Sequence, residues 1–297
     1  MTGEHQANLT GIGAMSIWAF IPLMLAVIGP MPPFLIGACA NLSAFAAIAL
    51  WWLYKGESLS GKFHMMPKAY LAGIFGFTLY NVLFIYAMKT GPLFEISLLN
   101  YTWPAFLIVF SMLVQKTKPE GMALLGIAAC FAGAGFVFAS RGPLSFSGVH
   151  VTMLLGLTAG FLWGAYSSVL KHVPIKSDQV AVFFLMTGLV TLGLHLWLEP
   201  TEWPATALRW GALVVFASGR IAYLFWNYAM KHGSPRLLGS LSYFIPLVSA
   251  LLLATFGFAR HSPYLMLGAT LVVSGCIVIN LKTISANVSL MMGRKPA

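Results

Sequence analysis

Hydrophobic residues run through this chain in long uninterrupted blocks. Ten stretches of about 20 residues carry few or no charges, and this is the length that an α-helix needs to cross a bilayer. They cover residues 10–28, 33–54, 67–87, 91–114, 120–139, 151–170, 179–198, 207–229, 234–257 and 261–281. The segments between them are short and more polar. The pattern predicts an all-α integral membrane protein with ten transmembrane helices.

Composition and charge agree with a lipid environment. Hydrophobic residues make up 59% of the 297 residues and charged residues only 8%, whereas a soluble domain has about a quarter charged residues. Basic residues gather on the side of the N-terminus, where twelve are expected: Lys55, Lys62, Lys68, Lys116, Lys118, Lys171, Lys176, Lys231, Arg236, Lys282, Arg294 and Lys295. The other side has four: Lys89, Arg141, Arg209 and Arg260. This bias predicts that both termini are cytoplasmic and that the basic charge serves orientation in the bilayer, with no nucleic-acid partner.

The chain repeats itself. "YAMK" occurs at residues 86–89 and again at 228–231, and the same offset of 142 aligns Tyr101 with Tyr243 and Pro104 with Pro246. At an offset of 145, "GIGAMSIWA" (11–19) lies over "GLTAGFLWG" (156–164), which pairs Trp18 with Trp163. We therefore expect two five-helix repeats, residues 1–142 and 143–297. Because five is odd, the second repeat is inverted in the membrane, an arrangement typical of transporters with a substrate site at the repeat interface.

Two duplicated prolines point to that interface. Tyr101 and Tyr243 lie roughly 15 Å deep at a rise of ~1.5 Å per residue, close to the bilayer centre. Three residues on, Pro104 and Pro246 each free the carbonyl four residues back, at Asn100 and Ser242. A freed carbonyl in hydrocarbon is tolerated against a neighbouring helix or a water-filled cavity. The duplication beside a Tyr favours the cavity.

Aromatic residues separate by depth. Seven near span ends are predicted to form interfacial belts: Trp51, Trp52, Tyr54, Trp197, Trp203, Trp210 and Trp226. Deeper ones are predicted to line one roomy central chamber, with two Asn side chains as polar groups: Trp18, Tyr80, Tyr101, Trp103, Trp163 and Tyr243, with Asn81 and Asn100. Such a wall suits an apolar or aromatic substrate.

Arg220 is the single basic residue expected inside a span. A central Arg costs about 2.5–3.5 kcal/mol on insertion scales, which makes it a functional candidate. Glu95, the one acidic residue expected in a span, lies too near the end of its helix for a direct pair. Arg220 is predicted either to attract a substrate carboxylate or to be held by cavity waters and backbone carbonyls.

"EISLLNYTWP" (95–104), "SYFIP" (242–246) and the ten-span pattern resemble the EamA-type transporters of the drug/metabolite transporter superfamily. Within it, the chain is most similar to the aromatic amino-acid exporter group (YddG type) of Gram-negative bacteria. The resemblance implies export of amino acids and related metabolites across the bacterial inner membrane by alternating access. It also implies that Tyr101, Trp103 and Tyr243 fall on segments lining a central cavity.

Alternatives remain within the same architecture. They are a drug/cation or other metabolite exporter of the superfamily, or a channel-like pore. Small four-helix relatives carry a Glu in their first span, where this chain has Trp18 and Pro22. Drug/proton antiport is therefore less expected, and without a carboxylate at the midplane we predict a facilitator.

The sequence offers no set of residues that would support enzyme chemistry. His195 is the one His expected inside a span, near its end where interfacial water reaches it, and no carboxylate partner is expected for it. The three Cys residues are scattered in apolar stretches, so no catalytic set, cofactor or metal site is predicted. Glycine faces at 126–133 and 268–275 suit helix packing within the chain or, less simply, a dimer. We expect a monomer or weak homodimer.

Overall fold

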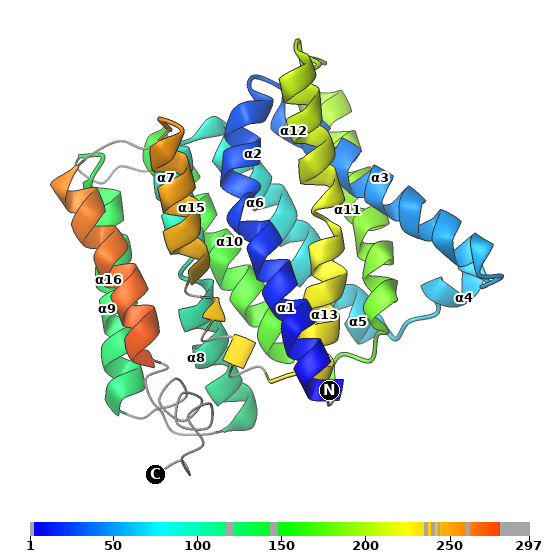
Figure 1. Cartoon of the computed structure of the whole chain (residues 1–297), viewed down its shortest axis with the longest axis horizontal. Helices are drawn as coiled ribbons and strands as arrows, with labels where there is room; N and C mark the ends of the chain where they lie inside the picture. Colours follow the sequence, from blue (N-terminus) through cyan, green and yellow to red (C-terminus); the bar gives the residue numbers. More distant parts are fainter. Residues whose placement is uncertain are drawn as a thin grey trace.

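The computed structural model describes residues 3–116, 121–142, 148–234, 237–238, 241–242, 244–258 and 262–279, and these form a bundle of helices (Figure 1). The elements are α1 (Gly3–Ala19), α2 (Ile21–Ile28), α3 (Pro33–Tyr54), α4 (Leu59–Phe63), α5 (Pro67–Leu71), the π-helix η1 (Ala72–Thr78), α6 (Leu79–Thr90), α7 (Leu93–Asn100), α8 (Trp103–Gln115), α9 (Gly121–Ala139), α10 (Val149–Val169), the 3₁₀ turns η2 (Leu170–His172) and η3 (Ser177–Gln179), α11 (Val180–Leu198), α12 (Ala207–Ser218), α13 (Ile221–His232), α15 (Phe244–Thr255) and α16 (Pro263–Ile279).

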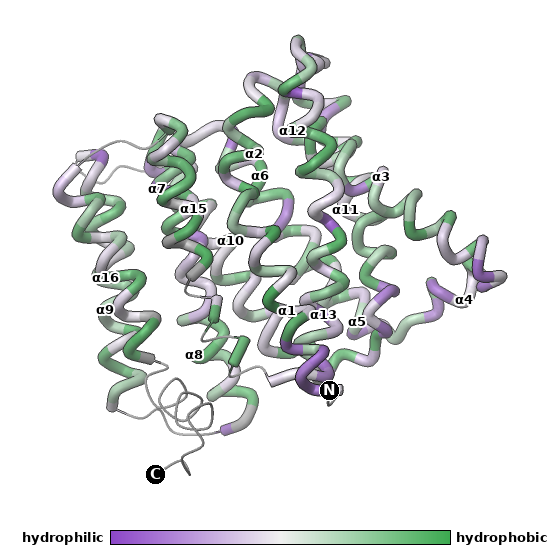
Figure 2. The backbone as a smooth tube through the Cα atoms, in the orientation of Figure 1, coloured by the Kyte–Doolittle hydropathy of each residue, from purple (hydrophilic) through white to green (hydrophobic). Residues whose placement is uncertain are grey.

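The prediction of an all-helical membrane protein is confirmed. Within the described ranges, eight stretches are long and apolar enough to cross a bilayer: Gly3–Ile28, Pro33–Tyr54, Pro67–Thr90, Leu93–Val114, Gly121–Ala139, Val149–Val169, Ser177–Leu198 and Ala207–His232. The predicted spans 234–257 and 261–281 are described only in part, as α15 and the shorter apolar helix α16. Figure 2 shows hydrophobic residues along the helices and hydrophilic ones mainly at helix ends, such as the start of α1 and around α4.

Several spans break near their middle. The first divides at Phe20, just before Pro22, and the fourth divides at Tyr101–Thr102, just before Pro104. The third passes through the π-helix η1, and the eighth divides between α12 and α13 at Gly219–Arg220. Proline and π-turns are the ordinary causes of such breaks. As a result, four spans offer irregular backbone at their middles.

Helices α9 and α16 lie side by side at one edge of the bundle (Figure 1). A Cβ on Gly133 would come within 2.7 Å of the Gly268 carbonyl oxygen, and one on Gly275 within 2.6 Å of the Gly126 carbonyl oxygen. These glycines therefore let the two backbones touch. The glycine faces that suggested a dimer are used for packing within the chain.

The repeated lysines of "YAMK" make equivalent contacts in the two halves. Lys89 donates to the Gly29 carbonyl and, at 3.4 Å, to the Leu25 carbonyl at the end of α2. Lys231 donates to the Ile175 carbonyl and, at 3.2 Å, to the Val173 carbonyl beyond the end of α10. Each ammonium thus binds backbone carbonyls at or just beyond the end of the first span of its own half, where the helix dipole also favours a cation.

We expect Lys89→Met and Lys231→Met each to destabilise the protein by about 1.5–3 kcal/mol, the usual worth of hydrogen bonds to a charged group. Thermal unfolding of purified protein in detergent measures this. Lys55→Met is the matched control, because Lys55 is exposed at the end of α3. Equal unfolding temperatures for all three variants would contradict the assignment.

Candidate functional site

A small cavity lies where the broken spans meet. Its walls come from eight helices and the α7–α8 break: Trp18, Ile21, Pro22, Tyr80, Phe84, Asn100, Tyr101, Trp103, Trp163, Tyr223 and Ile245. We call this the central chamber. Six of the nine residues predicted from the sequence line it. Asn81 and Arg220 lie beside it, and Tyr243 lies outside the described residues.

The expectation of a roomy chamber is wrong for this conformation. The cavity measures about 30 Å³, far below the range of about 300–1,000 Å³ that is usual for small-molecule pockets. Aromatic side chains fill the space. Trp18 meets Trp163 edge-on at 5.4 Å between ring centroids, and Tyr80 lies 5.0 Å from Trp163. The chamber is therefore closed in this conformation, with no room for a molecule the size of an amino acid.

Trp226 and Trp52 were wrongly predicted to be belt residues. Trp226 is 0% exposed and lies 5.3 Å from Trp18 and 5.6 Å from Trp103. It shares the buried face of α13 with Tyr223, one turn earlier. Trp52 is also buried and donates to Asp178 at 3.1 Å. The other five are exposed, as a belt requires: Trp51, Tyr54, Trp197, Trp203 and Trp210.

Arg220 is held by a neutral partner. The side chain is 4% exposed, and its Nη1 donates to Asn81 Oδ1 at 2.6 Å. Its guanidinium also lies 4.6 Å from the ring centroid of Phe216 and 5.6 Å from that of Tyr223. No carboxylate among the described residues forms an ion pair with it. The positive charge beside the chamber is therefore not neutralised within the described part of the chain.

Three buried polar atoms here have no hydrogen-bond partner among the described residues: Trp18 Nε1, Asn100 Oδ1 and Arg220 Nε. Two are donors and one is an acceptor. Buried groups of this kind are costly unless something satisfies them. Trp18 and Asn100 both line the chamber, so a polar ligand entering it finds partners already in place.

The freed carbonyl of Asn100 is covered by a helix, so the prediction that it faces a cavity is wrong. A Cβ on Gly160 of α10 would come within 2.7 Å of that carbonyl oxygen. The hydroxyl of Tyr101, the residue at the break, lies 2.8 Å from Ser249 Oγ. Ser249 Oγ in turn donates to the Ala19 carbonyl at 2.7 Å. This chain of hydrogen bonds joins the breaks of the first and fourth spans through α15.

Sequence reasoning missed Tyr223. Its hydroxyl donates to Asn81 Oδ1 at 3.4 Å, and its ring lies 5.4 Å from those of Trp18 and Trp163. A signal was available, because Tyr223 is the residue that the 142-position offset aligns with Asn81. Ser249 was missed as well, and a lone Ser in an apolar span gives no comparable signal.

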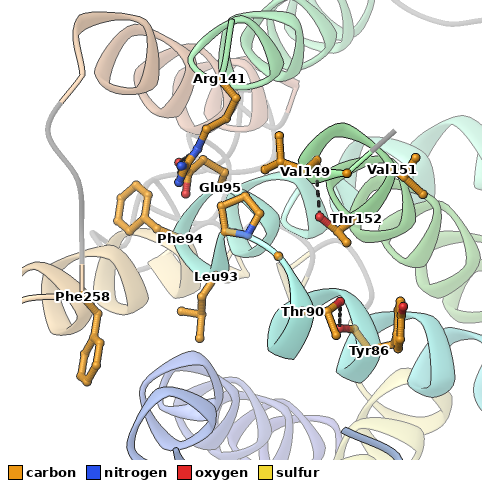
Figure 3. Close-up of a pocket in the computed structure, with 13 residues that line it drawn as sticks. Tyr86, Thr90, Leu93, Phe94, Glu95, Arg141, Val149, Val151, Thr152 and Phe258 are labelled. Atoms are coloured by element: carbon orange, nitrogen blue, oxygen red, sulfur yellow. Dashed lines mark hydrogen bonds and ion pairs between the residues drawn. The ribbon is translucent and has the colours of Figure 1, made fainter. Parts of the chain in front are cut away.

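A much larger cavity opens at the end of the bundle opposite the start of α1. It measures about 740 Å³ and we call it the vestibule: Tyr86, Thr90, Gly91, Pro92, Leu93, Phe94, Glu95, Arg141, Gly148, Val149, Val151, Thr152 and Phe258 line it. Figure 3 shows Arg141 reaching to Glu95 beside Phe94. Arg141 Nε donates to Glu95 Oε1 at 2.6 Å, and Nη2 pairs with the same oxygen.

Ion pairs lie at the other end of the bundle. Lys62, in the segment between α3 and α5, pairs with Glu57 and with Asp178 of η3, and we call this set the latch. Burial lowers the pKa of Lys62, but its hydrogen bonds to Asp178 and Glu57 and their charges outweigh this and raise the pKa above 10.5. Lys62 therefore stays charged at physiological pH, and the latch joins the first half to the second.

His195 is buried, so the prediction that interfacial water reaches it is wrong. It is 2% exposed, and its ring nitrogens lie 3.0 Å from Glu199 Oε2 and 3.0 Å from Thr201 Oγ1. Glu199 also accepts from the backbone N–H groups of Phe34 and Leu35 at the start of α3. The carboxylate partner four residues along was overlooked. The cluster ties α11 to α3, away from the chamber.

Comparison with known proteins gives this arrangement a context. The model of the EamA-like transporter family matches residues 5–139 and 150–281. The aromatic amino acid exporter YddG of Ancylobacter novellus is 31% identical, with 94% of this chain and 98% of the relative covered. YddG of Escherichia coli is 24% identical over the same shares. One solved structure, 29% identical, superposes with a TM-score of 0.72 and covers 93% of this chain and 98% of its own.

Proposed function

This chain belongs to the EamA-like transporter family, and from that premise we propose that it exports neutral and aromatic amino acids from the cytoplasm by alternating access. The observation that carries the proposal is Arg220, a buried cation held by the neutral Asn81 beside an aromatic chamber. An α-carboxylate is the simplest anion to complete such a site. The aromatic walls would take the side chain.

The substrate class rests on chemistry and on similarity together. The relatives named above are aromatic amino acid exporters. Another metabolite exporter and a channel-like pore are the competing functions. Liposomes holding the purified protein, tested with a panel of labelled amino acids and nucleotide sugars, decide among them. Saturable, competitive amino-acid exchange supports the proposal, and movement of nucleotide sugars alone or linear flux contradicts it.

The proposed topology has ten spans in two inverted repeats, residues 1–142 and 143–297. Residues lie beside their own repeat mates in two separate places: Tyr223 donates to Asn81, and Cys130 donates to the Val272 carbonyl at 3.3 Å. A residue contacts its mate only near the symmetry axis. One axis would therefore run from the α9–α16 pair to the chamber, across the bundle, which supports an inverted repeat.

Orientation follows from the charges. With the lysine-rich side in the cytoplasm, both termini are cytoplasmic, the latch closes the cytoplasmic face and the vestibule opens outward. The membrane would be the bacterial inner membrane. We take a monomer as the transport unit, because the glycine faces of α9 and α16 occupy each other.

We expect Trp163→Ala and Trp103→Ala each to lower kcat/KM for L-phenylalanine by about tenfold, the equivalent of roughly 1.4 kcal/mol of aromatic contact. Trp51→Ala is the control, because Trp51 is exposed and should leave transport unchanged. Initial rates in proteoliposomes measure the three variants. Equal losses of kcat/KM in all three variants would contradict a role of the chamber in transport.

Arg220→Ala should raise the KM for L-phenylalanine by about 10- to 100-fold, the range expected when a hydrogen bond to a charged group is lost. The KM for phenylalaninamide, which has no carboxylate, should change far less. Arg209→Ala removes the same charge away from the chamber and serves as the control. Equal losses for acid and amide would assign Arg220 a purely structural role.

A facilitator should not use a pH gradient. Of the described carboxylates, only Glu95 is buried in a span, and it is paired with Arg141 at the vestibule, away from the chamber. Liposomes with equal substrate on both sides and an imposed pH gradient should therefore show no accumulation. Accumulation that Glu95→Gln abolishes would identify a proton antiporter instead.

A further inference from the structure

The vestibule has the size and lining of a binding site. Its volume of about 740 Å³ falls in the range of about 300–1,000 Å³ that is usual for small-molecule pockets. Polar and apolar surfaces share the walls about equally, and the apolar part includes Leu93, Phe94 and the exposed ring of Phe258 on one side and Tyr86 on another (Figure 3). The vestibule shares no lining residue with the central chamber.

Helices α6, α7 and α10 each carry lining residues of both cavities. Helix α7 has Glu95 in the vestibule and Asn100 in the chamber, five residues apart, or about 8 Å along the axis. Helix α6 has Tyr86 in the vestibule and Phe84 in the chamber. Along these helices, the two cavities are therefore separated by about the length of one amino acid.

The charges of the two cavities differ. Beside the chamber lies a cation, Arg220, whose described partner is an amide. In the vestibule a cation and an anion lie together, with the Glu95 side chain buried and that of Arg141 21% accessible. A zwitterion carries the complementary pair of charges. Its carboxylate matches the planar guanidinium of Arg141, and its ammonium matches the carboxylate of Glu95.

We infer that the vestibule is a second amino-acid site on the exit path, where the α-carboxylate and α-ammonium groups of the substrate replace the Glu95–Arg141 ion pair. The inference rests on the proposed function. Exchanging one ion pair for two charge-matched contacts leaves neither buried charge without a partner, which avoids the high cost of an unpaired buried charge. The apolar walls would hold the side chain meanwhile.

Membrane vesicles of the two orientations test this, with the vestibule facing the medium in one and the lumen in the other. With external L-phenylalanine, Arg141→Gln should raise KM about tenfold from the vestibule side and less than twofold from the latch side. Arg209→Gln is the matched control, since it removes the same charge outside the vestibule and should change neither value.

Two analogues identify which group each residue recognises, as competitors of uptake from the vestibule side. Glu95→Gln should weaken inhibition by phenylalaninamide, which keeps the ammonium, and leave inhibition by N-acetylphenylalanine unchanged. Arg141→Gln should do the reverse. If the ion pair has only a structural role, its loss would lower the unfolding temperature. It would also weaken the binding of L-phenylalanine, phenylalaninamide and N-acetylphenylalanine equally, from both sides of the membrane. That result would overturn the inference.

Val149→Trp provides a test that leaves both charges in place. Val149 lines the vestibule (Figure 3), so the larger ring should occupy part of it and raise KM from the vestibule side only. If the charge variants do not fold, an unchanged KM in Val149→Trp overturns the inference. Wild-type vesicles that move no amino acid would instead defeat the proposed function itself, so the two failures are distinguishable.

Discussion

Hydrocarbon supplies no hydrogen bonds, and the centre of this protein follows from that constraint. Each break in a spanning helix leaves backbone groups that only protein or enclosed water can satisfy. The breaks at Tyr101 and Gly219–Arg220 are therefore buried, whereas at the break in the first span the Phe20 side chain is exposed. Gly160 covers one freed carbonyl, and Ser249 bonds another at Ala19. The chamber is the place where this irregular backbone gathers.

Arg220 is subject to the same constraint, because its polar side chain also needs partners within the protein. It lies at the break between α12 and α13 and is positioned by Asn81, which follows the π-helix of the third span. Asn81 is itself fixed by a hydrogen bond from its Nδ2 to the Phe77 carbonyl at 2.9 Å. An amide positions the guanidinium without neutralising it. A carboxylate in the same place would compete with any anionic substrate, so a neutral partner is what a binding cation requires.

The sequence predicted this architecture well where periodicity or repetition carried the information. Span positions and six chamber residues followed from hydropathy and from the aligned halves. The prediction failed where the depth of a residue in the membrane was used to infer which way its side chain faces. Trp226 lies near a span end, yet faces inward because the helix rotates Tyr223 and Trp226 onto one side. The volume of the chamber, set by ring orientations, could not be predicted at all.

The repeated scaffold carries two unlike ends. The 142-position offset that relates Lys89 to Lys231 relates Glu95 to Leu237 and Lys62 to Pro204. Neither the vestibule ion pair nor the latch therefore has a counterpart at the other end of the bundle. Unlike ends can give the transporter different apparent affinities on its two faces. They cannot drive accumulation, because affinities that differ between faces are balanced by the rates of conformational exchange when no second gradient is coupled. In a facilitator, direction would then come from the substrate's own gradient alone, and unlike ends would set only how tightly each face holds the substrate.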